Sequence, residues 1–256
     1  MHHLNATRLL AGASVLLLVT AGAANAQVTE SPGTVEPGKV LVEMDAWSYS
    51  RDREGPELVT STVWANTLVT TGVSPTLDLQ LGAQARLEET YDAGEGEERV
   101  AGFGDVLLRA KWAFYQDEKS GFSAALLPFL KLPTNSGGVG NDHVEGGVIL
   151  PVERTFPGGW YFGANAEVDL VRDGDDSGYA LDLIGTAYAG KDITDRLFLY
   201  VEAIGYSPES GQDEAYAGAG AFVTVTEALS FDYEYLAGVN RAGADHAHTF
   251  RANWKF

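Results

Sequence analysis

Acidic and basic side chains recur at every second position along many segments of this chain. Arg109 and Lys111 are two residues apart, as are Glu167 and Asp169, and an apolar residue lies between the members of each pair. Residues two apart share one face of an extended strand, so these charges should meet on a common surface. Such a surface can hold a network of salt bridges, or it can form charge rings that select solutes at a pore.

Catalysis and metal binding are less well supported by the residues. A hydrolase would need a nucleophile beside a His base, yet after residue 26 the histidines are His143, His246 and His248, and no serine spacing suggests a triad. We therefore expect no enzyme. Asp245 could join His246 and His248 around a divalent ion, but a third defined ligand is missing. We expect a polar rim there, with no metal and no other cofactor.

The segment Leu77–Glu88 shows which kind of element carries these charges. Its odd positions are all apolar, and its even positions are polar, charged or glycine. At 3.6 residues per turn, a helix would spread both kinds of residue over its whole surface, so the pattern predicts a strand. About ten such residues, at about 3.3 Å each and a tilt near 40°, rise roughly 25 Å, which is the height of an outer-membrane apolar band.

The same alternation recurs along the chain and predicts twelve strands with no helix between them. Longer polar loops, such as those at residues 51–57 and 91–99, should alternate with short turns. Short turns at one rim and longer loops at the other are typical of a transmembrane barrel with both termini in the periplasm. The expected strands are Lys39–Ser50, Leu58–Thr71, Leu77–Glu88, Gly104–Tyr115, Phe122–Leu132, Val144–Val152, Trp160–Val171, Tyr179–Ala189, Leu197–Tyr206, Tyr216–Val225, Leu229–Val239 and Ala247–Phe256.

The chain begins like an exported protein. Arg8 precedes an apolar run that ends in Ala24-Asn25-Ala26, which predicts a signal peptide at 1–26, followed by a periplasmic leader at 27–38 and the barrel at 39–256. There is no Cys for a disulfide. Without Arg8, 16 basic residues stand against 36 acidic ones, a formal charge of −20, which argues against nucleic acid as a partner.

Three features indicate that the apolar faces meet lipid rather than the core of a soluble sandwich. The strands have ten or more residues, aromatic residues lie near several strand ends, and the chain stops in FRANWKF. A last strand that ends in aromatic residues resembles the signal read by the outer-membrane assembly machinery, here Trp254 and Phe256. We expect an all-β, transmembrane, antiparallel up-and-down β-barrel of about twelve strands, located as a monomer in the outer membrane.

Two motifs also resemble a known family. GFGDVLLRAKWAF at 102–114 and FLKLPTN at 129–135 are similar to the outer-membrane transporter family labelled putative MetA-pathway of phenol degradation. The matching positions are Asp105, Lys111 and Leu132-Pro133-Thr134; Asn135 stands where the pattern usually has Gly. The resemblance implies a signal-bearing barrel that passes small molecules, aromatic ones among them.

The function should reside on the inward face of the barrel. We expect passive passage of small solutes, aromatic or hydrophobic ones among them; the alternatives are a non-conducting structural or adhesive barrel and a secreted soluble β-protein. The partners would be the bilayer with lipopolysaccharide, the assembly machinery and the solute. The candidate lumen and selectivity residues are Arg86, Asp105, Arg109, Lys111, Lys131, Glu145, Glu167, Asp182 and Glu202. The same residues could instead form a structural salt-bridge network.

Overall fold

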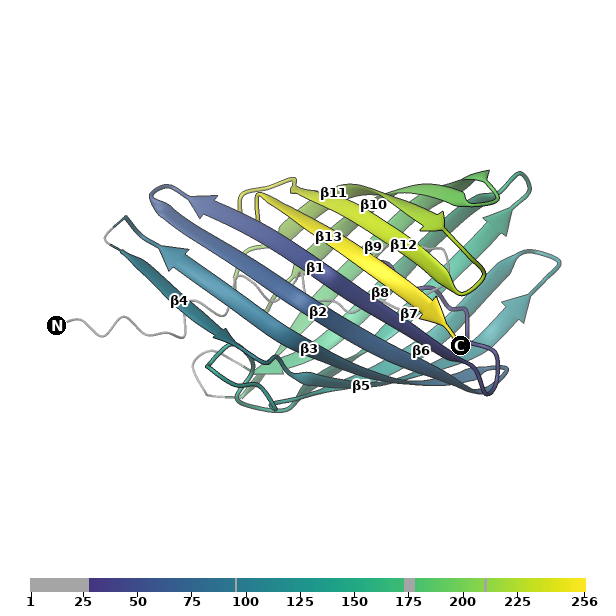
Figure 1. Cartoon of the computed structure of the whole chain (residues 1–256), viewed down its shortest axis with the longest axis horizontal. Coiled ribbons are helices and arrows are strands. Elements are labelled where there is room, and N and C mark those ends of the chain that lie inside the picture. Colours follow the sequence, from purple (N-terminus) through teal and green to yellow (C-terminus); the bar gives the residue numbers. More distant parts are fainter. Residues whose placement is uncertain (1–27, 95, 173–177, 210) are drawn as a thin grey trace.

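The computed structural model describes residues 28–94, 96–172, 178–209 and 211–256, so the predicted signal peptide lies outside the described residues. Twelve strands form a closed antiparallel barrel, and one further strand, β4, extends from its rim (Figure 1). None of the described residues forms a helix long and apolar enough to cross a membrane. The predicted fold class is therefore confirmed.

The strands follow the predicted segments closely, and most are longer at one end. Their bounds are β1 Val40–Glu54, β2 Glu57–Ser74, β3 Leu77–Asp92, β4 Glu97–Gly102, β5 Val106–Asp117, β6 Phe122–Leu132, β7 Glu145–Phe156, β8 Trp160–Arg172, β9 Tyr179–Thr194, β10 Leu197–Ser207, β11 Glu214–Thr224, β12 Leu229–Gly238 and β13 His246–Lys255.

The barrel closes because β1 pairs with β13 and β2 pairs with β3. At the seam Val40 and Phe256 exchange backbone hydrogen bonds of 3.2 and 2.8 Å. Both ends of the wall therefore lie at one rim, beside the short turns between β2 and β3, β5 and β6, β7 and β8, β9 and β10, and β11 and β12. In an outer-membrane barrel this is the periplasmic rim.

Two of the loops predicted for the opposite, extracellular rim are wrong. The expected loop at 51–57 is mostly strand, because β1 runs to Glu54 and β2 begins at Glu57. The expected loop at 91–99 is a hairpin, in which β4 pairs with the outer end of β3. Polar and charged residues form strands here because they lie beyond the apolar band, where alternation with apolar residues is not required.

A line of irregular residues crosses β1, β2 and β3 at the same height. Asp45, Asn66 and Gln84 lie opposite one another, and so do Trp47, Trp64 and Arg86, whereas Ala46, Ala65 and Ala85 between these two rows are skipped in the pairing. Ala65 has a φ of 50°, a conformation that is uncommon for a non-glycine residue. The extra residue in each strand exchanges its inward and outward faces above the line.

Polar and charged side chains fill much of the barrel interior, with apolar clusters between them. One cluster toward the extracellular side contains Ile184, Ile204, Tyr216 and Leu236, with Val28 packed against it. A second cluster, nearer the periplasmic turns, contains Tyr188, Phe198, Tyr200 and Phe222. Since Val28 precedes β1 in the chain, this contact already places the N-terminal segment inside the barrel.

Candidate functional site in the lumen

The N-terminal segment, defined here as Val28–Glu36, lies inside the barrel. Its inner end is held by Glu202 on β10, whose carboxylate accepts hydrogen bonds from the backbone N–H groups of Val28 and Thr29 and from the Thr29 hydroxyl. The Asn165 side-chain amide on β8 donates to the Glu30 carbonyl at 3.1 Å and accepts from the Glu30 N–H at 2.7 Å. The segment is thus bound by the wall through both its backbone and its side chains.

Glu30 carries the main charged contact between the segment and the wall. Its carboxylate forms an ion pair with the Arg109 guanidinium and lies 3.5 Å from the Lys111 Nζ. The side chains of all three residues are at most 2% exposed. The Lys111 Nζ also donates to the Gly33 carbonyl at 3.3 Å. Arg109 and Lys111 are two apart on β5, so the strand period places both cations against one carboxylate.

The periplasmic end of the segment, at Val35 and Glu36, is fixed close to β2 and β3. Asp78 accepts from the Val35 N–H at 3.1 and 3.2 Å. The segment passes so close to Gly72 that a Cβ there would lie 2.4 Å from the carbonyl oxygens of Val35 and Glu36. Only glycine fits this approach without displacing the segment.

Two cavities lie on opposite sides of this barrier, and they share no lining residue. The upper, extracellular one has a volume of about 130 Å³ and is lined by Glu30 and Arg109 together with residues nearer the extracellular rim. The lower one, of about 610 Å³, is lined by Ser31, Gly33 and Lys111 together with residues of the periplasmic mouth, among them Phe256. The segment and its ion pair therefore separate the two halves of the lumen.

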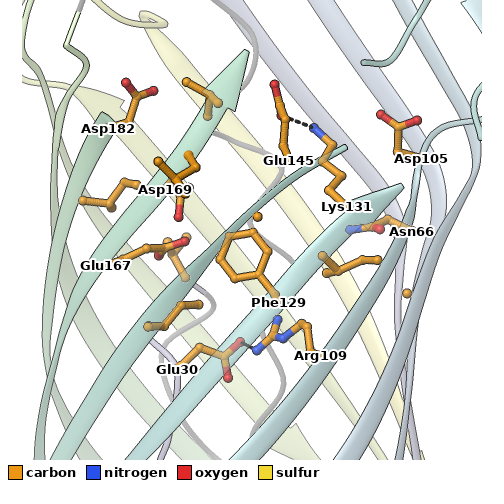
Figure 2. A pocket seen from close by; sticks show the side chains of 18 of the residues that line it. Glu30, Asn66, Asp105, Arg109, Phe129, Lys131, Glu145, Glu167, Asp169 and Asp182 are labelled. Atoms are coloured by element: carbon orange, nitrogen blue, oxygen red, sulfur yellow. Dashed lines mark hydrogen bonds and ion pairs between the residues drawn. The ribbon is translucent and has the colours of Figure 1, made fainter. Parts of the chain in front are cut away.

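The upper cavity combines charged groups with apolar side chains (Figure 2). The Lys131 Nζ lies 4.0 Å from the Glu145 carboxylate, and Glu145 also accepts from the Arg172 N–H at 2.9 Å. Phe129 lies between Lys131 and Arg109 on the same wall. Other apolar lining residues are Leu107, Ile149, Leu170 and Ile184.

The structure brings most of the predicted lumen residues together. Six of them line the upper cavity: Asp105, Arg109, Lys131, Glu145, Glu167 and Asp182. Lys111 lies below them, and Glu202 holds the segment. In the part of the chain that the structure describes, no group of three or more His, Cys, Asp or Glu side chains could hold a metal ion.

The expected inward position of Arg86 is wrong. Its side chain is 50% exposed on the outer surface, opposite Trp64, and it contacts Glu88, which also faces outward. Leu87, expected on the outside, is buried in the lumen against Val63. The irregular line at Ala85 shifts the alternation by one residue, which reverses every face above it.

Sequence reasoning did not identify Thr29 and Glu30 as lumen residues. The leader has no alternation, so it offers no signal of which face or which partner its side chains take. Its one sequence cue is that Glu30 is a carboxylate just ahead of a barrel whose β5 carries two cations. Phe129 is two residues before Lys131, so the two-residue period indicates that it faces inward, but the predicted lumen residues are all charged ones.

Asp105, just before β5, holds the loop that follows β6. Its carboxylate accepts from the N–H groups of Thr134, Asn135 and Asn141 at 3.1, 3.2 and 2.8 Å, and from the Asn135 side-chain amide at 2.8 Å. The loop also lies close to the end of β4, because a Cβ on Gly102 would be 1.8 Å from the Ser136 carbonyl oxygen. The loop is therefore folded against the extracellular mouth of the lumen.

Asp105, Thr134 and Asn135 lie in the two segments, 102–114 and 129–135, that resemble motifs of a protein family. Residues 23–256 match the model of the family described as putative MetA-pathway of phenol degradation. The chain belongs to this family. Its two MetA-pathway motifs, distant in sequence, meet through Asp105 and Thr134. Asn135, which replaces the usual Gly, adds a side-chain bond to the same carboxylate.

Solved structures share the fold of this MetA-pathway family member. The COG4313 outer membrane channel from Pseudomonas putida F1 is 12% identical, with a TM-score of 0.68 over 88% of this chain and 97% of that chain. The NanC porin is 9% identical, with a TM-score of 0.57 over 84% and 100%. The translocator domain of autotransporter NalP from Neisseria meningitidis is 12% identical, with a TM-score of 0.53 over 85% and 88%. No curated protein sequence matches the chain.

These similarities establish the architecture and the location. Family membership and the closed twelve-strand barrel place the chain in the outer membrane. Trp254 and Phe256 occupy the last positions of the seam, where Phe256 is 68% exposed. Their role as an assembly signal stays a prediction. Because channels and an autotransporter translocator share this barrel, the function must be argued from the lumen.

We expect Asp105→Ala to loosen the loop at the extracellular mouth. Hydrogen bonds to a charged group are worth about 1.5–3 kcal/mol each, so losing this carboxylate should speed amide exchange at Thr134, Asn135 and Asn141 about 10- to 100-fold. Hydrogen exchange with mass spectrometry measures this directly. Asp142→Ala, in the same loop, is the control. Equal exchange in the two variants would contradict the anchoring role of Asp105.

Proposed function

We propose that the barrel passes small, largely apolar molecules, aromatic ones included, passively across the outer membrane, and that the N-terminal segment closes the route between passages. The observation that supports this most directly is the pair of cavities separated by the segment at Glu30. Each cavity lies toward one rim, so movement of a single segment would join them. No part of the barrel wall would need to open.

The upper cavity supports the class of solute. Its volume of about 130 Å³ is near the roughly 150 Å³ of an engineered apolar cavity that binds benzene. Phe129, Ile149 and Ile184 offer apolar contacts, while Lys131 and Asp182 could orient one polar group. A hydroxylated aromatic ring fits this combination of size and lining.

A non-conducting barrel is the second candidate, and the buried ion pair favours it. Glu30 and Arg109 are almost fully buried, and such a pair can serve to hold a filled lumen in one arrangement. The two functions differ in what happens when the segment is absent. A channel gains conductance, whereas a structural barrel whose remaining side chains fill the lumen does not.

The test compares the full mature chain with a variant that lacks residues 28–36, both refolded in planar bilayers. We expect small, rare conductance from the full chain and larger, persistent conductance from the variant. Benzyl alcohol should reduce the variant's ion current at lower concentration than arabinose does, because its ring can pack against Phe129, Ile149 and Ile184 of the upper cavity. Different gel migration of unheated and heated samples confirms that each barrel is folded.

Two results would contradict the proposal. If a folded deletion variant showed no conductance, the non-conducting barrel would be supported. If the variant conducted but arabinose and benzyl alcohol reduced the current equally, the route would be open to water-soluble molecules in general. The proposed solute class would then be wrong, while the closing role of the segment would stand.

A further inference from the structure

The outer wall above the irregular line has an organised pattern of charges. Strand pairing aligns outward residues in rows across β13, β1, β2, β3 and β4. One row is His248, Tyr49, Thr62, Glu88 and Ala101, and the next row outward is His246, Arg51, Thr60, Thr90 and Arg99. Exposure shows which residues face outward, because the paired residues Trp64 and Arg86 are exposed, while Val63 and Leu87 in the adjacent row are buried in the lumen.

Four arginines lie on this wall, and we call Arg51, Arg53, Arg86 and Arg99 the arginine patch. Arg86 and Arg99 both contact the Glu88 carboxylate, and their side chains are still 50% and 54% exposed. Among the side chains that the structure describes, that of Glu54 not included, no carboxylate forms an ion pair with Arg51 or Arg53. Asp92 and Glu97 lie in the row of Arg53, across Leu58, which is one outward-facing row beyond Arg51 and closer to the tip of the hairpin.

The height of the patch matches the surface of the outer leaflet. From Leu77 to Arg86 the strand rises about 23 Å at about 3.3 Å per residue and a tilt near 40°, close to the roughly 25 Å of an apolar band. Aromatic side chains lie at the same level. The ring centroids of Trp47 and Tyr49 are 6.1 Å apart in a stacked pair, and those of Tyr235 and His248 are 5.0 Å apart. Such residues gather where the apolar core of a membrane meets its headgroups.

We propose that the arginine patch binds the phosphate groups of lipopolysaccharide. The protein has a formal net charge of −19, so most of its surface would repel anionic lipid. The arginine patch is a cluster of exposed cations that would attract it. The planar guanidinium donates two parallel hydrogen bonds to phosphate oxygens. Thr60, Thr62 and Thr90 provide hydroxyl groups between the cations, and the aromatic side chains below would contact the acyl chains.

Lipid binding to the folded mature barrel tests the proposal. The protein in detergent, with a chelator present, is titrated with lipid A that carries two phosphates and, separately, with lipid A that carries one, and bound lipid is counted by native mass spectrometry. One arginine near an anionic surface is worth about fivefold in affinity, so R51Q/R53Q should bind the bisphosphorylated lipid about 25-fold more weakly. E88Q should bind it more tightly, because Arg86 and Arg99 would lose their competing carboxylate.

The matched control removes two outward cations at the other rim. Arg154 lies over Phe156 and Lys191 over Trp160, both close to the periplasmic turns, so R154Q/K191Q should leave affinity unchanged. Weaker binding of monophosphorylated lipid A would further support phosphate recognition. Equal affinity of wild type and R51Q/R53Q would overturn the proposal. An equal loss in R154Q/K191Q would also overturn it, since it would show general charge attraction in place of a site.

Discussion

Glu30→Gln should raise the conductance of the barrel strongly without unfolding it. The substitution removes the carboxylate that both Arg109 and Lys111 contact in a site that is almost fully buried. Breaking a buried ion pair by removing one partner costs about 3–5 kcal/mol. Glu167 also interacts with Arg109, so we expect the lower end of this range.

This loss of free energy should displace the N-terminal segment rather than unfold the barrel. Backbone ladders hold the wall together, whereas the segment is held mainly by side-chain contacts to Glu202, Asn165 and Asp78. A loss of about 3 kcal/mol would shift the ratio of displaced to seated segment by about two orders of magnitude. Single-channel recording of the mature protein measures the open fraction.

Glu36→Gln is the matched control, because it neutralises an exposed carboxylate at the periplasmic end of the segment. We expect its open fraction to equal that of the wild type. If Glu30→Gln behaved like this control in a folded barrel, the ion pair at Glu30 would not be what keeps the segment seated. The hydrogen bonds from backbone N–H groups of the segment to the carboxylates of Glu202 and Asp78 would then carry that role.

Arg251→Gln should destabilise the whole barrel. The Arg251 Nε lies 2.6 Å from Asp45, and the same carboxylate accepts from the Asn66 side-chain amide at 2.9 Å. This connection joins β13, β1 and β2 across the seam between the first and last strands, and the side chains of Arg251 and Asp45 are each 7% exposed. We expect a loss of about 3–5 kcal/mol in the free energy of unfolding. Urea unfolding in lipid vesicles measures it.

Two further variants show whether this effect comes from the pair itself. Lys255→Gln changes an exposed cation on the same strand, and a surface change of this kind should stay within about 0.5 kcal/mol. The double variant Asp45→Asn/Arg251→Gln should lose less than the sum of its single substitutions, because neither charge is then left buried alone. Additive losses would indicate that Arg251 stabilises the seam through other contacts.

The sequence by itself determined the class of fold and most of the wall. Phe122–Leu132 has the same bounds as predicted, and the alternation in Leu77–Ala85 placed Gln80 in the lumen and Leu81 outside, as their exposures of 4% and 52% show. Such predictions succeed because the two-residue period is local: a lipid-facing strand must be apolar at every second position regardless of its neighbours. The charged face of β5 followed from the same rule.

Tertiary structure decided where that rule stops and what fills the lumen. The irregular line reverses the faces of Arg86 and Leu87, and it exists because three neighbouring strands each carry an extra residue at one height. The N-terminal segment has no periodicity, and its anchor joins Thr29 to Glu202, 173 residues away. Whether a carboxylate such as Glu30 meets Arg109 or water depends on closure of the whole barrel around it. Such a contact is fixed by distant parts of the chain, so no local pattern could have indicated it.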